Sequence, residues 1–160
     1  MKKTILLTSI FAITIITSCK KSESTTASKS KSEYLVASPW KQTSVTINPG
    51  IVVGGVTITD LFLLMQACQK DDTRKFNTGG SGVMDEGVSK CDPTDPQTTP
   101  FTWSLISSDS KLVMNDGSGA DTTNVVQLDG STFKGSQVMD GADVGGTPGT
   151  KYTVTMTATH

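Results

Sequence analysis

Few side chains in this 160-residue chain are suited to catalysis: three cysteines, one histidine and several neighbouring carboxylates. Nucleophilic catalysis pairs a hydroxyl or thiol with a base, but the single histidine is the last residue, His160. Serines are abundant, yet none stands in the Gly-x-Ser-x-Gly turn that exposes a hydrolase nucleophile. We therefore expect no enzymatic activity and no cofactor.

The carboxylates occur as Asp71-Asp72, Asp85-Glu86 and Asp92 with Asp95. Acid–base catalysis would need burial to raise the pKa of one member of such a pair. All three pairs lie in or beside predicted turns, where Asp side chains ordinarily hydrogen-bond to the backbone. Gly-rich loops hold further oxygen ligands that could bind calcium, but without EF-hand spacing; they are Asn115, Asp116, Asp121, Asp140 and Asp143. We favour turn formation for both groups and predict no metal site.

Cys19 follows a segment that is typical of an export signal. Lys2 and Lys3 precede a mostly apolar run over residues 5–16, which is shorter than the roughly 20 residues that span a bilayer and fits a signal peptide. Ile16-Thr17-Ser18-Cys19 resembles the lipobox of bacterial lipoproteins, in which the cysteine is lipidated and becomes the first residue of the mature protein. The alternative is an ordinary signal peptide followed by a chance cysteine.

The lipobox resemblance divides the chain into three parts. Residues 1–18 would be the lipoprotein signal peptide, residues 19–33 a disordered Ser/Lys-rich tether, and residues 34–160 the folded domain. Several acyl chains on Cys19 would hold the protein stably to a membrane. Lys20 stands where an aspartate commonly retains lipoproteins at the inner membrane, so we expect an outer-membrane lipoprotein of the cell envelope, facing either the periplasm or the surface.

The two remaining cysteines and the charge of the domain limit its chemistry further. From residue 34 onward, eight basic residues stand against thirteen acidic ones, a net charge of −5, which disfavours nucleic-acid binding. With Cys19 lipidated, Cys68 and Cys91 form a pair, and an exported compartment permits disulfides. We predict a Cys68–Cys91 disulfide rather than a metal site, because His160 is the only histidine that could join them.

The folded part reads as short strands separated by turn residues. Phe101, Trp103 and Leu105 alternate with polar residues, as do the apolar residues of 151–159, so each strand should bury one face. A short helix is expected at 61–67, and the Asn48-Pro49-Gly50 turn should end the first strand. The expected strands are 40–47, 72–77, 82–86, 101–105, 111–115, 124–128, 131–138 and 151–159, with 51–58 as a strand, a bulged strand or an extended loop. About eight strands in hairpins predict an all-β fold, either an antiparallel barrel or a sandwich.

Three segments together resemble a known family: CQKDDTRKFNTGG at 68–80, KCDPTDPQ at 90–97 and FTWSL at 101–105. They are similar to the lipocalin-like domain of small bacterial lipoproteins, with Trp40 at the place of that family's first-strand tryptophan. Ser38 stands where the family has a glycine. The resemblance spans about residues 38–159 and implies an up-and-down β-barrel of eight strands with an apolar interior.

Two functions remain open on this evidence. In the first, the barrel binds a small hydrophobic ligand, and its lining comes from the large residues on the predicted strands: Trp40, Phe76, Phe101, Trp103, Phe133 and Tyr152. The alternative is that these side chains fill the barrel. The protein would then be an envelope interaction or structural lipoprotein that acts through its outer face and the loops 92–100, 116–123 and 140–150.

Overall fold

The structure is a computed structural model that describes residues 28–160 of the chain. The predicted signal peptide, the lipidation site at Cys19 and residues 19–27 of the predicted tether lie outside these residues. Within residues 28–160, no helix has the length and apolar character needed to cross a membrane.

Nine strands in this part of the chain form one antiparallel sheet, in the order β2-β1-β3-β4-β5-β6-β7-β8-β9. Because β1 also pairs with β9, the sheet closes on itself and β2 is left as an extra strand outside the barrel. The strands are β1 (Trp40–Val53), β2 (Val56–Asp60), β3 (Thr73–Phe76), β4 (Ser81–Asp85), β5 (Thr98–Ile106), β6 (Lys111–Asn115), β7 (Ala120–Leu128), β8 (Thr132–Asp140) and β9 (Lys151–Thr159). The predicted antiparallel barrel is confirmed.

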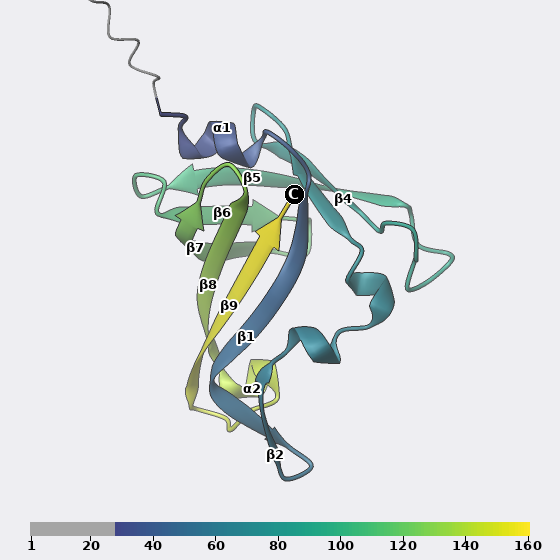
Figure 1. Ribbon diagram of the computed structural model, residues 1–160, viewed down its shortest axis with the longest axis vertical. Coiled ribbons are helices and arrows are strands. Elements are labelled where there is room, and N and C mark those ends of the chain that lie inside the picture. The colour runs from purple at the N-terminus through teal and green to yellow at the C-terminus, as the bar shows by residue number, and fades with distance from the viewer. Residues whose placement is uncertain (1–27) are drawn as a thin grey trace, which may run out of the picture.

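One end of the barrel is closed by a short helix, α1 (Lys31–Leu35), which Figure 1 shows across the top of the strands. Ser30 and Glu33 form a capping box at its start, each side chain bonding to the other residue's backbone N–H. Leu35 is fully buried in the core, and its carbonyl accepts a 2.8 Å hydrogen bond from Nε1 of Trp40. Residues 31–33, which the composition assigned to a disordered tether, are therefore helical.

The first strand is longer than the sequence indicated. Asn48-Pro49-Gly50 was expected to end it, but β1 runs through these residues to Val53. The register of β1 against β2 shifts between Thr46 and Ile51, and an irregular stretch of this kind tolerates a proline, which has no N–H to donate. Gly54 and Gly55 then take positive φ angles in a tight hairpin turn into β2. In Figure 1 this hairpin extends away from α1 at the lower end of the molecule.

The helix predicted at 61–67 is not continuous. It is replaced by two single 3₁₀ turns, η1 (Phe62–Leu64) and η2 (Ala67–Gln69), with Met65 extended between them. A helix of this length is stable only when it buries an apolar face, and Leu63 and Leu64 are exposed. A second helix, α2 (Gly141–Val144), lies in the Gly-rich segment that was expected to be a loop.

The apolar side chains form two separate cores. The larger lies inside the barrel beneath α1 and contains Leu35, Trp40, Phe76, Phe101, Leu112, Leu128 and Phe133. The smaller lies where β1, β8 and β9 extend past the barrel and contains Ile47, Ile51, Tyr152 and Val154. The predicted alternation is confirmed in β5, where Phe101 is buried between the exposed Pro100 and Thr102.

Candidate functional site

A cavity of about 220 Å³ lies inside the barrel. All eight barrel strands contribute side chains to its wall, and the loop between β6 and β7 contributes Asp116 and Gly119. The wall residues on the strands include Trp40, Gln42, Arg74, Phe76, Met84, Thr99, Phe101, Leu112, Met114, Asp121, Thr123, Phe133, Gln137, Met156 and Ala158. A barrel of eight strands has an interior wide enough either to be filled by side chains or to hold one small ligand, and here some of the space is left open.

The end of the cavity nearest α1 is apolar. Trp40 meets Phe133 edge-on at a centroid separation of 6.2 Å, and Phe76 meets Phe101 in the same way at 5.2 Å. Such edge-to-face contacts fix ring positions as well as burying area. The aromatic rings therefore form a defined apolar wall rather than a loose filling.

The opposite end of the cavity is more polar, because on β1, β3, β5 and β8 the polar wall residue lies farther from α1 than the apolar one. Gln42 follows Trp40 on β1, and Gln137 follows Phe133 on β8. On β3, which runs antiparallel to β1, Arg74 precedes Phe76. The cavity is thus amphiphilic along its length, with one apolar and one polar end.

Arg74 contributes a positive charge to the wall of the cavity. It shares a face of β3 with the buried Phe76, and its register partners Trp40 and Met84 both line the cavity. Burial lowers the pKa of the guanidinium, while the negative charge of Asp72 raises it. Among residues 28–160 the one ion pair joins Lys151 to Asp140, so within this part of the chain Arg74 has no carboxylate in contact.

A second, more polar cavity of about 340 Å³ adjoins the first. Gln42, Arg74 and Met84 line both cavities, and Asp72, Glu86 and Asp95 are among the other walls of the second. The pKa of Asp72 is raised, first by burial and then by repulsion from Glu86. Arg74 therefore stands between an apolar chamber and a polar one.

The predicted disulfide is confirmed: Cys68 and Cys91 are bonded, with their Cα atoms 5.2 Å apart. It joins η2 to the Pro-rich loop before β5. Met65 and Gln69 on one side of the bond, and Cys91 and Asp95 on the other, line the second cavity. The disulfide thus holds together the two segments that form the outer wall beside Arg74.

Four of the six proposed ligand-binding residues line the cavity, namely Trp40, Phe76, Phe101 and Phe133. Trp103 does not; it packs edge-on against Phe76 at 5.6 Å, and its Nε1 donates to the carbonyl oxygens of Ser81 at 2.8 Å and Asn77 at 3.2 Å.

Tyr152 is not in the cavity wall either. It belongs to the smaller core beyond the barrel, and its hydroxyl oxygen accepts a hydrogen bond from the Thr147 backbone N–H at 3.1 Å. Trp103 and Tyr152 therefore pack in structural parts of the domain. Aromatic strand residues are needed there as well as around the cavity.

The sequence analysis missed the polar wall residues Gln42, Arg74, Thr123 and Gln137. A signal for Arg74 was present, since it lies two residues before Phe76 in a strand and must share its face. Gln137 is held by two hydrogen bonds from its Nε2, to Thr123 Oγ1 at 3.0 Å and to the Thr122 carbonyl at 3.2 Å. The amide is thereby fixed at the polar end of the cavity.

The carboxylates proposed for acid–base or calcium chemistry mostly cap turns. Asp71 Oδ2 accepts from the N–H groups of Val88 and Ser89 at 2.8 and 2.9 Å, and the Ser89 bond is the main cause of its lowered pKa. Asp92 similarly accepts from Thr94, whose hydroxyl and N–H lower its pKa. Within residues 28–160, no three carboxylate, cysteine or histidine side chains are grouped so as to hold a metal ion.

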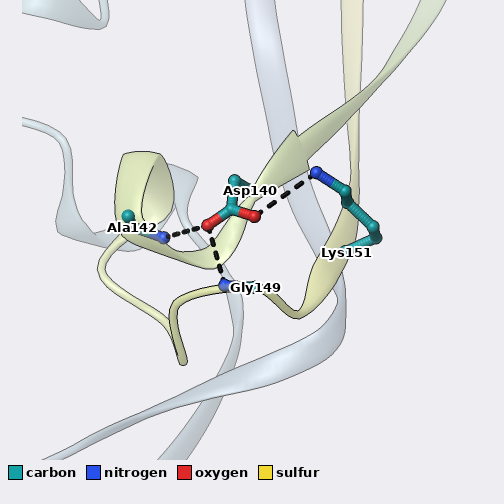
Figure 2. A network of polar contacts seen from close by, with 4 residues as sticks. All are labelled: Asp140, Ala142, Gly149 and Lys151. Carbon is teal, nitrogen blue, oxygen red and sulfur yellow. Dashed lines mark hydrogen bonds and ion pairs between the residues drawn. The ribbon is translucent and has the colours of Figure 1, made fainter.

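Asp140 shows the same role in the loop between β8 and β9. Figure 2 shows its Oδ1 accepting from the N–H groups of Ala142 and Gly149, each at 3.0 Å, and its Oδ2 paired with Lys151 at 3.3 Å. These bonds, led by the one from Ala142, lower the pKa of Asp140. The carboxylate therefore acts as the N-cap of α2 and closes the loop.

Neither of two comparisons with known proteins, one against family models and one against curated sequences, found a match to this chain.

Proposed function

We propose that this protein is a membrane-anchored bacterial lipoprotein whose lipocalin-like barrel binds a small, largely apolar molecule. The supporting observation is the interior cavity of about 220 Å³, whose wall is drawn from every strand of the barrel. A barrel packed solid with side chains would argue against this function, and the aromatic residues here leave space instead.

The cavity volume limits the size of the ligand. An apolar cavity of about 150 Å³ in a protein core takes up benzene, which has six carbon atoms. The cavity in this barrel should by the same scale take about nine non-hydrogen atoms, and it is smaller than the roughly 300 to 1,000 Å³ of pockets for drug-sized ligands. The proposed ligand is thus a short molecule with one apolar end.

The binding proposal is tested by filling the cavity. Ala158 lines it on β9, so Ala158→Phe should occupy the space and abolish binding. Thr153→Phe is the matched control, because Thr153 is exposed on the same strand. Native mass spectrometry of full-length protein, extracted in detergent from its own host, should show a bound small molecule on the wild type and the control. Its absence from the wild type would refute the proposal.

The anchoring part of the proposal rests on the lipobox-like residues 16–19 and on the family resemblance. It places the protein in the outer membrane, held by acyl chains on Cys19, with no catalytic step. Mass spectrometry of the membrane fraction should find an acylated Cys19 as the first residue. A soluble protein that retains Met1 would contradict it.

A second candidate function is an interaction through the outer surface. The observation that favours it is the tip of the β1–β2 hairpin, where Val52, Val53 and Val56 are 65%, 50% and 63% exposed. Contiguous exposed apolar side chains can mark contacts with other proteins. This function would survive Ala158→Phe, whereas it would be lost when the three valines are replaced by serine.

A further inference from the structure

We infer that the cavity selects a medium-chain carboxylate and that the guanidinium of Arg74 binds its head group. The inference rests on the proposed function, because it names the class of ligand for the same cavity. It is drawn from the position of Arg74, the groups around it and the polarity of the two cavity ends.

The position of Arg74 places its charge inside the barrel. The residue alternates on β3 with the exposed Lys75 and shares its inward face with Phe76, which is 2% exposed. Cross-strand pairing sets it beside Trp40 on β1 and Met84 on β4. The side chain lines both cavities, so a ligand in the apolar chamber would meet the guanidinium at its polar end.

Arg74 is partly buried, and removing a cation from water is unfavourable when no counter-ion contacts it. Within residues 28–160, the sole ion pair is that of Lys151 with Asp140, and Arg74 takes part in none. Asp72 lies two residues earlier and attracts Arg74, but burial and repulsion from Glu86 raise the pKa of Asp72. A carboxylate from a ligand would supply the missing negative charge, and the planar guanidinium can bind both of its oxygens at once.

Asp72 and Glu86 line the adjoining polar cavity and are partly buried, as Arg74 is, whereas the other charged groups in the wall of the apolar cavity are more exposed. Asp116 and Asp121 line the cavity but are exposed to solvent, and Asp116 already accepts hydrogen bonds from the N–H and hydroxyl of Ser118. Solvent screens exposed charges much more than buried ones. Arg74 is therefore the least screened charge in the wall of the apolar cavity.

The lining and volume of the cavity suit an alkyl chain attached to the head group. With the carboxylate at Arg74, the chain would point toward Phe76, Phe101 and Phe133 at the α1 end. Octanoate has ten non-hydrogen atoms, close to the size that the cavity volume allows. It is therefore the probe of choice, and 1-octanol is its neutral counterpart.

Isothermal titration calorimetry of the full-length protein with octanoate and with 1-octanol tests the inference. The readout is the ratio of the two affinities, which is insensitive to small changes in folding. Arg74→Met removes the charge at similar length, and Arg74→Lys keeps the charge but not the planar fork. Lys75→Met removes an exposed charge from the neighbouring position of the same strand and is the control.

The wild type should prefer octanoate, and Arg74→Met should lower the octanoate-to-octanol ratio about 10- to 100-fold, as expected for loss of a charge-assisted hydrogen bond. The ratio for Arg74→Lys should lie between those of the wild type and Arg74→Met, and the ratio for Lys75→Met should equal that of the wild type. An unchanged ratio in Arg74→Met, or octanol preferred by the wild type, would overturn the inference while leaving a binding function. If the wild type binds neither probe, both the inference and the proposed function fail.

Chemical denaturation of the same variants separates binding from a structural role. Replacing a partly buried cation that makes no ion pair with an apolar side chain of similar size removes a desolvation cost. Arg74→Met should therefore raise or preserve the urea midpoint while it loses octanoate selectivity. A large fall in the midpoint would show that Arg74 is a structural residue and would count against a ligand role.

Discussion

Gly82 should be intolerant of even one added methyl group, because the Phe101 ring lies directly over it. The two residues are paired across β4 and β5, and a Cβ built on Gly82 would overlap three carbon atoms of that ring. Phe101 is buried, lines the cavity and packs edge-on against Phe76. In Gly82→Ala the ring must therefore move, and the open space available to it is the cavity.

The cost of Gly82→Ala can be assembled from three contributions. Overpacking a core costs about 1 to 3 kcal/mol, and loss of the Phe76–Phe101 contact about 0.5 to 1.5 kcal/mol. Replacing a strand glycine by alanine returns about 0.5 to 1 kcal/mol of backbone entropy. The free energy of unfolding should fall by about 2 kcal/mol in total, which lowers Tm by roughly 5 to 10 °C for a domain of this size. Ligand affinity should fall as well, since the displaced ring occupies the cavity.

Thermal and urea unfolding followed by circular dichroism would measure this loss. Gly130→Ala is the matched control, because a Cβ there would lie 3.8 Å from Cε1 of Tyr34, an ordinary contact. The control should stay within about 0.5 kcal/mol of the wild type. If Gly82→Ala is as stable as Gly130→Ala, the ring does not lie where the structure places it, and the wall assigned to the cavity is wrong.

Three further predictions concern other parts of the domain. Replacing Cys68 and Cys91 together by serine should cost about 3 kcal/mol in the chain-entropy model; a urea midpoint equal to that of the wild type would contradict a structural disulfide. Hydrogen bonds led by that from Gln127 lower the pKa of Asp129 from 3.8 to about 2, so the stability they provide is present above pH 3.8 and is lost as the pH falls through about 2. The Asp129→Asn variant should therefore be less stable than the wild type at neutral pH, and the difference in free energy of unfolding should shrink as the pH falls through that window. A difference that does not change with pH would refute this role for the Asp129 carboxylate. Trp103→Phe removes the indole hydrogen bonds and should lower the free energy of unfolding by about 1 kcal/mol, while the affinity for octanoate stays unchanged. A large loss of octanoate affinity would show that Trp103 belongs to the binding site.

The barrel could be predicted from the sequence because its signals are local and repeated. In β5 and β9, alternation of apolar and polar residues indicates strands with one buried face, and Asp129-Gly130 marks the hairpin between β7 and β8. The pairing of Cys68 with Cys91 also followed from counting cysteines. Closure of the sheet depends on pairing between β1 and β9, which are distant in sequence, and only the family resemblance indicated it.

The wrong predictions came from local signals that long-range packing overrides. Asn48-Pro49-Gly50 reads as a turn, yet pairing with β9 continues through Asn48 and carries β1 onward. Composition assigned residues 31–33 to a tether, although Ser30 and Glu33 have the spacing of a capping box. The apolar run at 61–67 looked helical, but Leu63 and Leu64 are exposed, and it is Leu61, at the start of the run, that packs against the smaller core.

The polar end of the cavity could be recovered only in part. Because Arg74 lies two residues before Phe76 in a strand, the sequence could have predicted that Arg74 faces the barrel interior. The sequence could not show that Arg74 lacks a contacting carboxylate among the described residues. Gln42 and Gln137 come from strands that are far apart in the chain. Their approach to one end of the barrel follows from antiparallel closure, which local patterns do not encode.

The most direct test of the account is to identify what the barrel carries in its own host. Native mass spectrometry of the full-length wild-type protein from its host should show a bound molecule of about ten non-hydrogen atoms with an acidic head group. That molecule should be missing from Ala158→Phe and present on Thr153→Phe. A wild-type protein that carries no ligand, and that binds neither octanoate nor 1-octanol when they are supplied, would contradict the central claim.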